Sequence, residues 1–448
     1  MPRRSHRRQR LLLLPVCLVL LVAALLYFRC GRGRGPAPPP PRQTIAAPIT
    51  AQRDPALAPL RVREEDEGPN AVVLGFLPHW VDREHIRHDL LTDIACFAIE
   101  FHPDGSIKDA HGWPWLDAIN EAHAAGVRTH ITAQLFGAGD LKVFLTNPQA
   151  RRRFHHAIGT AAVVAGAAGI VIDFEGTTNN GWADHMPIFA AELRAYLEAE
   201  APGLRLSFAV PAVNWGEHWD FRALAKSSDH LIIMGYDYAG SWSERAGPSA
   251  PLIGRPQNVT ATVREEYAAV GGGGSEKLIL ALPHYGNHWL VDSGEAGAKA
   301  TRWVEFLTYS AMQRLLAEHE SRWDASSQTP WVRWRDRQGW HQVWYEDARS
   351  FRLKAQLAKK EGLGGIGLWA LGFSGSHPEL WREIEGLFID GLVCIGDLNG
   401  DNRVDGEDLH RLIEAYGETA AGDLNADGVT DQTDLLLLLD NYPSRCDD

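Results

Sequence analysis

Eight apolar, strand-like runs alternate with helix-like stretches in this 448-residue chain, and no other feature constrains the fold as strongly. Alternating strands and helices imply a parallel α/β sheet, because a parallel connection has to cross over the sheet. Eight such units are the number in a (β/α)8 (TIM) barrel. An open doubly wound sheet is the alternative, although no Gly-x-Gly-x-x-Gly follows the first run, which weakens a dinucleotide-binding version. The strand candidates are residues 71–78, 92–101, 128–136, 168–175, 204–212, 230–238, 277–285 and 364–371.

The gap between the seventh and eighth strand candidates is too long for a single connecting helix. The residues in this gap are rich in charge and in tryptophan, with Trp331, Trp334 and Trp344 among them. We therefore expect a small α+β lobe inserted at about residues 290–350 of a barrel domain that spans residues 69–390.

The N-terminal segment, residues 1–30, contains an apolar run at residues 11–28 that carries no charge. This run is about the minimum length for a membrane-spanning helix, and the five arginines before it favour a cytoplasmic N-terminus. We expect a single-pass anchor in the cell membrane with the barrel extracytoplasmic. A cleaved signal peptide, which would leave the protein secreted, is the alternative. Residues 31–68 are rich in proline and glycine, which indicates a stiff linker.

Charge is distributed unevenly along the chain, whose net charge is −13. Residues 1–42 carry nine arginines and no acid, residues 43–393 carry a net charge of −11, and residues 394–448 carry a further −11. An acidic body argues against nucleic acid as a partner.

Two carboxylates end the fourth strand candidate, in the run Gly-Ile-Val-Ile-Asp-Phe-Glu. Side chains alternate across a strand, so Asp173 and Glu175 point the same way as Val171, while the other apolar residues face the opposite side. A buried strand does not end in two acids on one face without a reason, because buried charge is costly unless it is paired or used. The acids either cap the next helix or pair with a base, or they belong to a reaction site.

Polar and aromatic residues stand at the C-terminal ends of nearly all the strand candidates, where chemistry sits in barrels of this kind. Acids, tyrosines and tryptophans are expected to ring one mouth of the barrel. Together with Met234, the residues at these strand ends are Trp80, Asp173, Glu175, Trp215, Tyr236, Asp237, Tyr285, Trp289 and Trp369.

These strand ends resemble glycoside hydrolase family 18, the chitinase-like barrels. Asp173 and Glu175 match the last two acids of the family's fourth-strand motif, and Trp369 matches its eighth-strand tryptophan. The sixth-strand motif Met-x-Tyr-Asp matches at residues 234–237. The segment at residues 342–350 looks like the spore-cortex, peptidoglycan-acting branch of the family.

The resemblance implies hydrolysis of β-1,4-linked N-acetylglucosamine in chitin or peptidoglycan, by a retaining mechanism in which the substrate's N-acetyl group is the nucleophile. Glu175 is then the general acid, Asp173 orients the acetamido group, and Tyr236 hydrogen-bonds to it. No cofactor is implied for catalysis. The substrate-binding candidates are Trp369, Asp237, Met234, Trp80, Trp215 and Tyr285, with Trp289 a further stacking candidate. Core packing is the alternative for Trp80, Trp215 and Trp289, and bracing of the mouth is the alternative for Asp237.

The sequence departs from the family pattern at two places. The first two acids of the fourth-strand motif are replaced by Ala168 and Val171, so Asp173 lacks the inner carboxylate that would share its proton. The peptidoglycan-acting branch also tends to lack this acid, so the loss does not imply an inactive enzyme. The third-strand Ser-x-Gly-Gly is not found around residues 134–139.

The acidic tail contains one loop twice, at residues 397–408 and 423–434, each followed by a helix-like stretch with the same apolar positions. Oxygen ligands recur at the spacing of an EF-hand-type calcium loop, with a backbone carbonyl at the seventh position. Cys394 and Cys446 stand at the two ends and would clasp the tail in an oxidising compartment. The metal-ligand candidates are Asp397, Asn399, Asp401, Arg403, Asp405, Asp408, Asp423, Asn425, Asp427, Val429, Asp431 and Asp434.

This duplicated loop and helix resembles a dockerin, which implies a small all-α, calcium-binding domain at residues 394–448 and a cohesin-like protein partner. Two other functions compete with the glycosidase. One is a non-catalytic, sugar-binding barrel of the same family, which the presence of Glu175 argues against. The other is a calcium-dependent surface assembly module that carries the barrel as cargo.

Overall fold

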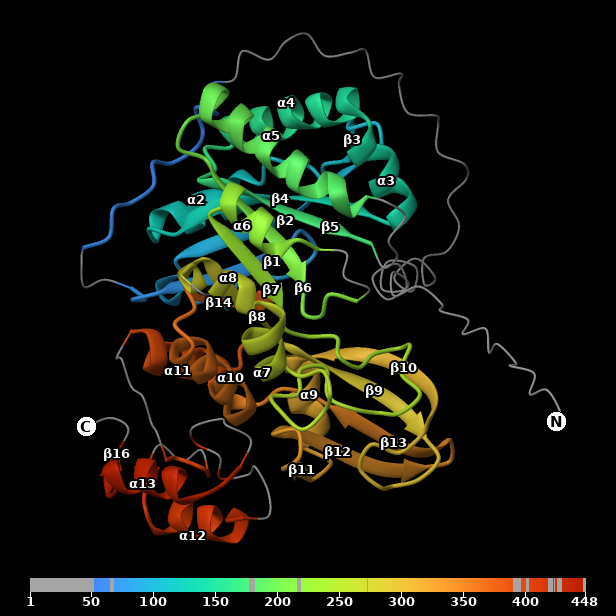
Figure 1. Cartoon of the computed structure of the whole chain (residues 1–448), viewed down its shortest axis with the longest axis vertical. Helices are drawn as coiled ribbons and strands as arrows, with labels where there is room; N and C mark the ends of the chain where they lie inside the picture. Colours follow the sequence, from blue (N-terminus) through green and yellow to red (C-terminus); the bar gives the residue numbers. More distant parts are fainter. Residues whose placement is uncertain are drawn as a thin grey trace, which may run out of the picture.

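Eight parallel strands close into a barrel in the computed structural model of the protein (Figure 1). Each strand pairs with the next around the ring, and β1 closes the circle by pairing with both β14 and β2. This closure confirms the predicted barrel and rules out the open doubly wound sheet. The barrel strands are β1 (Val72–Pro78), β2 (Asp93–Phe101), β4 (Arg128–Phe136), β5 (Gly169–Glu175), β6 (Arg205–Pro211), β7 (His230–Met234), β8 (Leu278–Pro283) and β14 (Gly365–Trp369).

The structure describes most of the chain from residue 52 onward. The described ranges are residues 52–64, 68–176, 182–215, 219–271, 273–389, 396–399, 403–417, 422, 424 and 429–445. The predicted membrane segment at residues 11–28 lies outside them. Within these ranges, no helix has both the length and the apolar character needed to cross a membrane.

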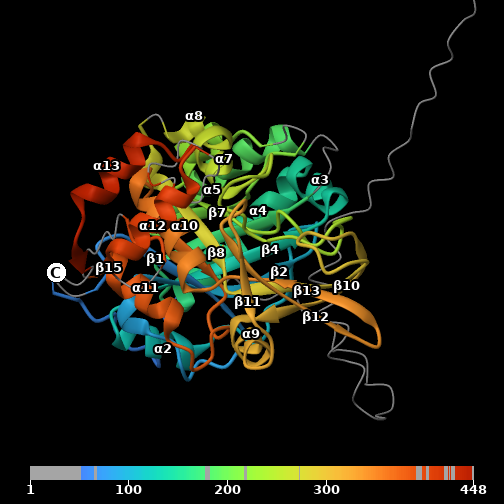
Figure 2. The same ribbon diagram turned by 90° about the horizontal axis from the view of Figure 1, so that it is seen from below.

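Helices cover the outside of the barrel and connect successive strands (Figures 1 and 2). The longest, α4 (Pro148–Val164), begins at Asn147, whose side chain accepts hydrogen bonds from two backbone N–H groups of the first turn. The others are α2 (Leu116–Ala124), α3 (Ala138–Thr146), α5 (Met186–Glu200), α6 (Phe221–Ser227), α7 (Val259–Ala261), α8 (Ala268–Gly271), α10 (Ala348–Lys360) and α11 (Glu379–Phe388). Shorter turns are η2 (His88–Leu90), η3 (Ala183–His185), the π-helical η4 (Thr262–Glu266) and η5 (Ser275–Lys277).

The barrel strands bury both faces, as their nearly continuous apolar sequences predict. On β5, Ile170, Ile172 and Phe174 pack in the layer between the strands and the outer helices. Val171 instead packs inside the barrel, in a separate cluster with residues such as Ile232. One face of each strand therefore builds the outer layer, and the other fills the interior below the mouth.

A second sheet lies between β8 and β14, in the stretch where the sequence predicts an α+β insertion. Its five antiparallel strands have the order β10-β9-β13-β12-β11, and α9 (Tyr309–Leu316) covers one face. We call this unit the lobe. Its strands are β9 (Tyr285–Val291), β10 (Ala300–Thr308), β11 (Ser321–Asp324), β12 (Thr329–Asp336) and β13 (Gly339–Trp344), whereas β3 (Ile107–Asp109) extends the barrel sheet beside β2.

The described part of the predicted linker, residues 52–64, lies against the barrel. Leu57 is buried with Ile119 and Ala165, from two different barrel connections. The backbone N–H of Arg61 donates a hydrogen bond of 2.9 Å to the carbonyl of His123. This stretch therefore belongs to the surface of the barrel domain.

The acidic tail forms a small unit beside α10 and α11 (Figures 1 and 2). It contains α12 (Gly406–Ala415), α13 (Gln432–Asp440) and a short antiparallel pair, β15 (Arg403–Val404) with β16 (Ser444–Arg445). The apolar positions predicted on each helix divide into two sets. Leu412 and Leu438, equivalent in the repeat, are fully buried in the tail's core. Their neighbours Ile413, Tyr416, Leu439 and Tyr442 are exposed.

Candidate active site

The two acids of β5 lie on one face at the mouth of the barrel, as the strand alternation predicts. Asp173 is buried at the end of the interior cluster that contains Val171, and Glu175, one pleat further, is partly buried. The neighbouring strand β4 aligns Gln134 with Asp173 and Phe136 with Glu175. The sequence of β5 therefore delivers both carboxylates to the space above the barrel core.

Among the described residues, neither acid has a capping contact or an ion-pair partner. Within the described residues, no cation contributes to the electrostatic surroundings of Asp173 or Glu175. Burial raises the pKa of Asp173. Burial also raises the pKa of Glu175 well above its ordinary value, and the negative charges of Asp173 and Asp237 raise it further. Glu175 therefore keeps a proton at a pH where an exposed glutamate has lost it.

One oxygen of Asp173, Oδ1, is buried and accepts no hydrogen bond from the described residues. A buried carboxylate oxygen without a donor costs free energy, which a bound N–H group would recover. Asp173 is thus arranged as an acceptor for a donor that enters through the mouth.

Aromatic residues stand at the same end of the barrel as this pair of acids. Trp369, at the end of β14, packs on the interior cluster, with its ring centroid 4.8 Å from that of Phe97 at an interplanar angle of 79°. Tyr236, just beyond β7, packs against the same cluster and lies 6.1 Å from Tyr285, centroid to centroid. The structure therefore brings together residues from strands that are far apart in sequence.

Asp237 stands at the end of β7 with a left-handed backbone, φ 61°. Its side chain is open to solvent at the mouth, yet protein surrounds it closely and burial raises its pKa, which hydrogen bonds from Tyr285 and Ser249 oppose. The hydroxyl of Tyr285 donates a short hydrogen bond to Asp237 Oδ1, and Ser249 Oγ lies 3.2 Å from the same oxygen. Sequence reasoning did not find Ser249, because it lies on a loop and belongs to no motif that we used.

The other predicted binding residues have mixed positions. Trp80, after β1, and Trp215, after β6, are 56% and 62% exposed, which suits stacking on a sugar ring. Met234 is partly buried at the end of β7. Trp289 is fully buried in the core of the lobe, so of the two alternatives for this residue, core packing and sugar stacking, the structure supports core packing. Trp242, on the loop after β7, is 38% exposed, and it is not among the stacking candidates that the sequence predicts.

A polar cluster that the sequence did not reveal lies beside Trp80. The ring of His79 stacks on that of His111, with centroids 3.9 Å apart, and contacts Trp80 edge-on at 4.7 Å. Glu100 accepts hydrogen bonds from Lys108 at 2.7 Å and from His111 at 3.0 Å. Strands β2 and β3 bring these residues together although no single motif contains them.

The predicted metal ligands in the tail are only partly described. Asp401, Asp423, Asn425 and Asp427 lie outside the described residues, as do Cys394 and Cys446. Where the structure describes the chain, no group of three or more acidic, histidine or cysteine side chains converges as a metal site would.

The last acid of each tail loop has the same contacts in both repeats. Asp408 Oδ1 accepts from the N–H of Leu398 at 2.7 Å, and Asp434 Oδ1 accepts from the N–H of Leu424 at 2.7 Å. The second oxygen of each acid accepts a hydrogen bond from the N–H of the residue that caps the following helix. These residues are Asp405 for Asp408 and Asp431 for Asp434. The duplicated sequence therefore produces a duplicated local structure.

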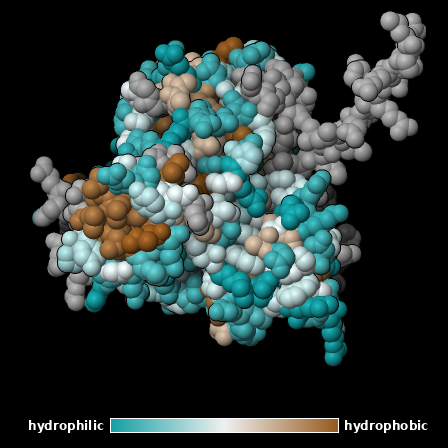
Figure 3. Space-filling view, turned by 60° about the horizontal axis from the view of Figure 1, so that its bottom comes forward, coloured by the Kyte–Doolittle hydropathy of each residue, from teal (hydrophilic) through white to brown (hydrophobic). Residues whose placement is uncertain are grey.

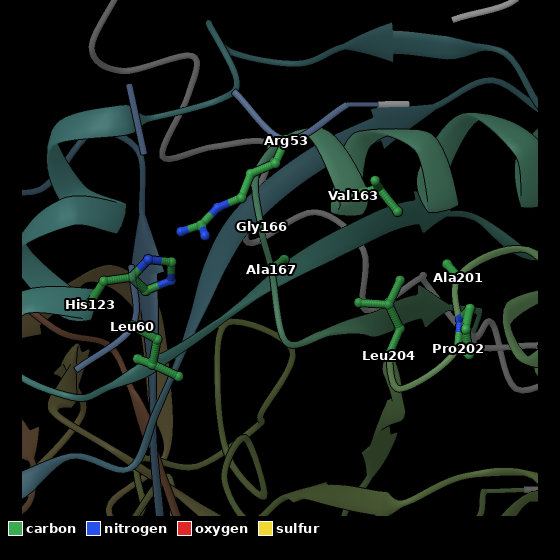
Figure 4. Close-up of a pocket in the computed structure, with 9 residues that line it drawn as sticks. All are labelled: Arg53, Leu60, His123, Val163, Gly166, Ala167, Ala201, Pro202 and Leu204. Carbon is green, nitrogen blue, oxygen red and sulfur yellow. The ribbon is translucent and has the colours of Figure 1, made fainter. Parts of the chain in front are cut away.

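A pocket of about 290 Å³ lies beside Gly166 and Ala167, which precede β5 (Figure 4). The two acids stand at the other end of this strand. Arg53 and Leu60, from the segment that precedes the barrel, line it together with His123 at the end of α2. No acid lines it, so we assign it no part in the chemistry of the mouth.

Comparison with known proteins shows relatives that include sporulation and cortex-lytic proteins, chitinases and oviduct-specific glycoproteins. The family model Glycosyl hydrolases family 18 matches residues 80–373. The putative sporulation-specific glycosylase YdhD of Bacillus subtilis is 28% identical over 377 residues, covering 76% of this chain and 85% of that protein. The cortical fragment-lytic enzyme of Bacillus anthracis is 26% identical over 307 residues, covering 65% of this chain and 67% of that protein.

Solved structures have the same fold. The GH18 chitinase from Cycas revoluta, in complex with (GlcNAc)3, superimposes with a TM-score of 0.63 at 22% sequence identity. The superposition covers 70% of this chain and 98% of the chitinase. At this identity the likeness establishes the barrel and not the substrate.

Proposed function

This chain belongs to glycosyl hydrolase family 18, and we propose that it hydrolyses β-1,4-linked N-acetylglucosamine in chitin or peptidoglycan. The observation that carries the proposal is the pair of β5 acids at the mouth. Burial and nearby negative charge raise the pKa of Glu175 and so favour its protonated form, and Asp173 presents a buried oxygen that lacks a donor among the described residues. A proton donor beside a hydrogen-bond acceptor is what a substrate-assisted glycosidase requires.

In the proposed reaction, Glu175 gives its proton to the glycosidic oxygen as the bond from that oxygen to C1 breaks. The carbonyl oxygen of the substrate's own acetamido group attacks C1 and forms a cyclic intermediate. Asp173 accepts a hydrogen bond from the acetamido N–H and stabilises the positive charge that develops there. Water then attacks C1 as the bond from C1 to the acetamido oxygen breaks, one proton of the water passes to Glu175, and the sugar leaves with its acetamido group restored and with retained configuration.

The remaining residues bind and orient the sugar. Tyr236 donates a hydrogen bond to the acetamido carbonyl, and Trp369 forms the apolar floor beneath the ring at the cleavage point. Trp80 and Trp215, both exposed near the mouth, stack on sugars further along the polymer. Asp237, Met234 and Tyr285 complete the wall on the side of β7 and β8.

A comparison of products on chitin oligomers and on purified peptidoglycan tests the proposal and distinguishes the two polymers. The chain is similar to proteins named for sporulation and cortical fragment lysis, which supports peptidoglycan. New reducing ends from either polymer, absent with Glu175→Gln, support hydrolysis. Binding of oligomers without turnover by the wild type would indicate the non-catalytic, sugar-binding alternative.

For the tail, we propose a calcium-dependent docking domain of the dockerin kind, with a cohesin-like protein as its partner. The observation in its favour is the duplicated surface: Ile413 and Tyr416 on α12 have exposed counterparts in Leu439 and Tyr442 on α13. An apolar patch lies over this part of the molecule (Figure 3). Exposed apolar patches of this kind commonly mark protein interfaces.

The described ligand candidates carry side-chain oxygen, the ligand type that calcium prefers. In the structure Asp397 instead pairs with Arg352, and both oxygens of Asp408 accept backbone N–H groups, so calcium binding would require these contacts to be shared or exchanged. Asp397, Asn399, Asp405 and Asp408 would serve the first loop, and Asp431 and Asp434 the second. Calcium would supply folding free energy to a unit too small to build much core. Binding of the full chain to an immobilised cohesin domain, with and without calcium, tests this role. The double variant Ile413→Asp/Leu439→Asp, which places charge on the proposed docking surface, is the negative control and should not bind.

The cellular location is also a proposal. An anchor at residues 11–28 would hold the chain in the cell membrane with the barrel on the outside, whereas cleavage of the segment would release it as a secreted protein. In either case Cys394 and Cys446 would meet an oxidising compartment. Fractionation of cells that express the full chain, with and without residues 1–30, distinguishes the two.

A further inference from the structure

A loop that leaves the end of β7 returns to it at Ser249. This residue is buried although the loop lies at the barrel mouth. Its backbone carbonyl accepts a hydrogen bond of 2.9 Å from the N–H of Tyr238, so the loop is tied down directly beside Asp237. Ser249 matches no motif in the sequence, and none of the roles assigned above involves it.

The hydroxyl of Ser249 contacts Asp237 at two points. It accepts a hydrogen bond of 3.1 Å from the backbone N–H of Asp237, and it lies 3.2 Å from Oδ1 of the same residue. It also lies 3.2 Å from the hydroxyl of Tyr285, which itself donates to Asp237 Oδ1. Two hydroxyl protons are therefore shared among three oxygens, and both stabilise the carboxylate of Asp237.

The backbone of Asp237 needs this support. Its φ of 61° lies in the left-handed region, which non-glycine residues seldom adopt and which costs free energy unless the surroundings compensate. Ser249 and Tyr285 hold the residue from two directions, one from the loop and one from β9.

We propose that Ser249 is a positioning residue for the hydrolysis, which fixes the carboxylate of Asp237 at the mouth so that its negative charge acts on Glu175. The inference rests on the proposed function. The titratable groups that face Asp237 are Glu175 from β5, Tyr236 beyond β7 and Tyr285 from β9. No cation is among the groups that influence Asp237 within the described residues.

The direction of the effect follows from the charges. The hydroxyl of Ser249 lowers the pKa of Asp237, and the negative charge of Asp237 raises the pKa of Glu175. Without the hydroxyl, Asp237 binds a proton more readily and carries less charge. The pKa of Glu175 then falls, and the proposed acid loses its proton at a lower pH.

The test compares Ser249→Ala with Ser249→Thr, which retains the hydroxyl, and with Ser243→Ala as the matched control. Ser243 lies on the same loop and accepts a hydrogen bond from the N–H of Gly240, away from Asp237. We expect Ser249→Ala to lower kcat/KM on an N-acetylglucosamine oligomer about tenfold, as for a lost hydrogen bond to a charged group. We also expect it to move the basic limb of the pH profile to lower pH, with Ser249→Thr and Ser243→Ala close to the wild type.

A loss of rate with an unmoved basic limb would overturn the positioning role, because a general disturbance of folding lowers the rate without a change in the profile. A crystal structure of Ser249→Ala gives a second reading that does not depend on turnover. The proposal requires Asp237 to leave its left-handed conformation or its contact with Tyr285. If both persist, the proposal is wrong, and if the wild type cleaves no oligomer, the proposed function is wrong and the crystal structure alone decides the role of Ser249.

Discussion

The guanidinium of Arg352, on α10, lies 2.5 Å from a carboxylate oxygen of Asp397 at the beginning of the acidic tail. The same guanidinium donates two hydrogen bonds, of 2.6 and 3.2 Å, to Glu383 on α11. All three side chains are nearly inaccessible to solvent. Two barrel helices and the tail therefore share one buried cation.

Arg352→Gln should loosen the tail from the barrel. Removing one partner of a buried ion pair leaves charge without compensation, at a cost of roughly 3–5 kcal/mol. We expect the variant's tail to be removed by limited proteolysis at least about tenfold faster, while the barrel stays folded. Arg382→Gln, an exposed residue of α11 with the same change in charge, is the control. Equal rates of cleavage in both variants would contradict the role of Arg352 in holding the tail against the barrel.

Glu175→Gln should reduce turnover of N-acetylglucosamine polymers by about 10²-fold or more, the range for loss of a general acid. The amide preserves the size of the side chain but has no proton to give at neutral pH, so binding should change much less than rate. The measurement is kcat and KM on a fluorogenic oligomer, with the exposed Glu265→Gln as the control. Activity of Glu175→Gln within a few-fold of the wild type would remove Glu175 from the mechanism.

Val171→Asp should shift the pH dependence of activity to higher pH. Val171 is fully buried one pleat below Asp173, so a carboxylate there would add negative charge beneath the acid pair and raise the pKa of Glu175 further. A general acid with a higher pKa stays protonated to a higher pH, so the basic limb of kcat/KM should move up. Val171→Asn introduces a similar shape without the charge and should leave the limb in place.

Val171→Asp should also lower the free energy of unfolding. Low activity of this variant could therefore come from partial unfolding or from the added charge, and the two have to be distinguished. A polar group in the apolar interior of the barrel is destabilising unless it finds a partner. Thermal unfolding of both variants measures this cost. A basic limb that moves equally in Val171→Asp and Val171→Asn would contradict the electrostatic account.

The sequence alone was sufficient to predict the barrel and the placement of the two acids, because both follow from short-range patterns. Strand alternation placed Asp173 and Glu175 on one face, and the apolar run before them required a buried strand. Ser249 could not be found in this way, since its role depends on a loop that returns to its starting point 12 residues later. Contacts between distant loops leave no periodic signal in a sequence.

Tryptophan shows a second limit of the sequence. Trp80 and Trp289 both stand beyond a barrel strand, and residue type alone does not distinguish them. In the structure Trp80 is open to solvent, whereas Trp289 lies in the lobe's core, because β9 continues directly from the end of β8 and carries it into a second sheet. The length of the insertion was visible in the sequence, but its first strand was not.

Removal of calcium should unfold the tail and leave the barrel intact. The described core of the tail is small, with Leu398, Val404, Leu412 and Leu438 as its buried members, so ligand binding would supply much of its stability. We expect a calcium chelator to make residues 396–445 of the full chain sensitive to protease, and added calcium to reverse this. Magnesium at the same concentration is the control. Tail resistance that is unchanged by chelation would contradict a calcium-dependent fold.

At the end of the barrel opposite the mouth, a buried acid is held by two basic residues. Asp93 accepts a hydrogen bond of 2.6 Å from His130 and two, of 2.9 and 2.7 Å, from Arg128. Burial alone would raise the pKa of Asp93, but the hydrogen bonds and charges of these partners outweigh it and hold the pKa far below its ordinary value. A carboxyl group whose pKa is lowered by folding stabilises the protein while it is ionised in both states.

Asp93→Asn should therefore destabilise the protein at neutral pH, by about 3–5 kcal/mol for a broken buried pair. The contribution of Asp93 is present in full above the pKa of an unfolded aspartate, about 3.9, and declines as the pH falls below it. Urea unfolding of the variant and the wild type should thus differ by a constant amount from pH 7 to about pH 4, and by a progressively smaller amount at lower pH. Asp292→Asn, an exposed acid, should change stability by less than about 0.5 kcal/mol at either pH. A difference between Asp93→Asn and the wild type that stays constant from pH 7 to pH 3 would show that the loss is one of packing and not of charge.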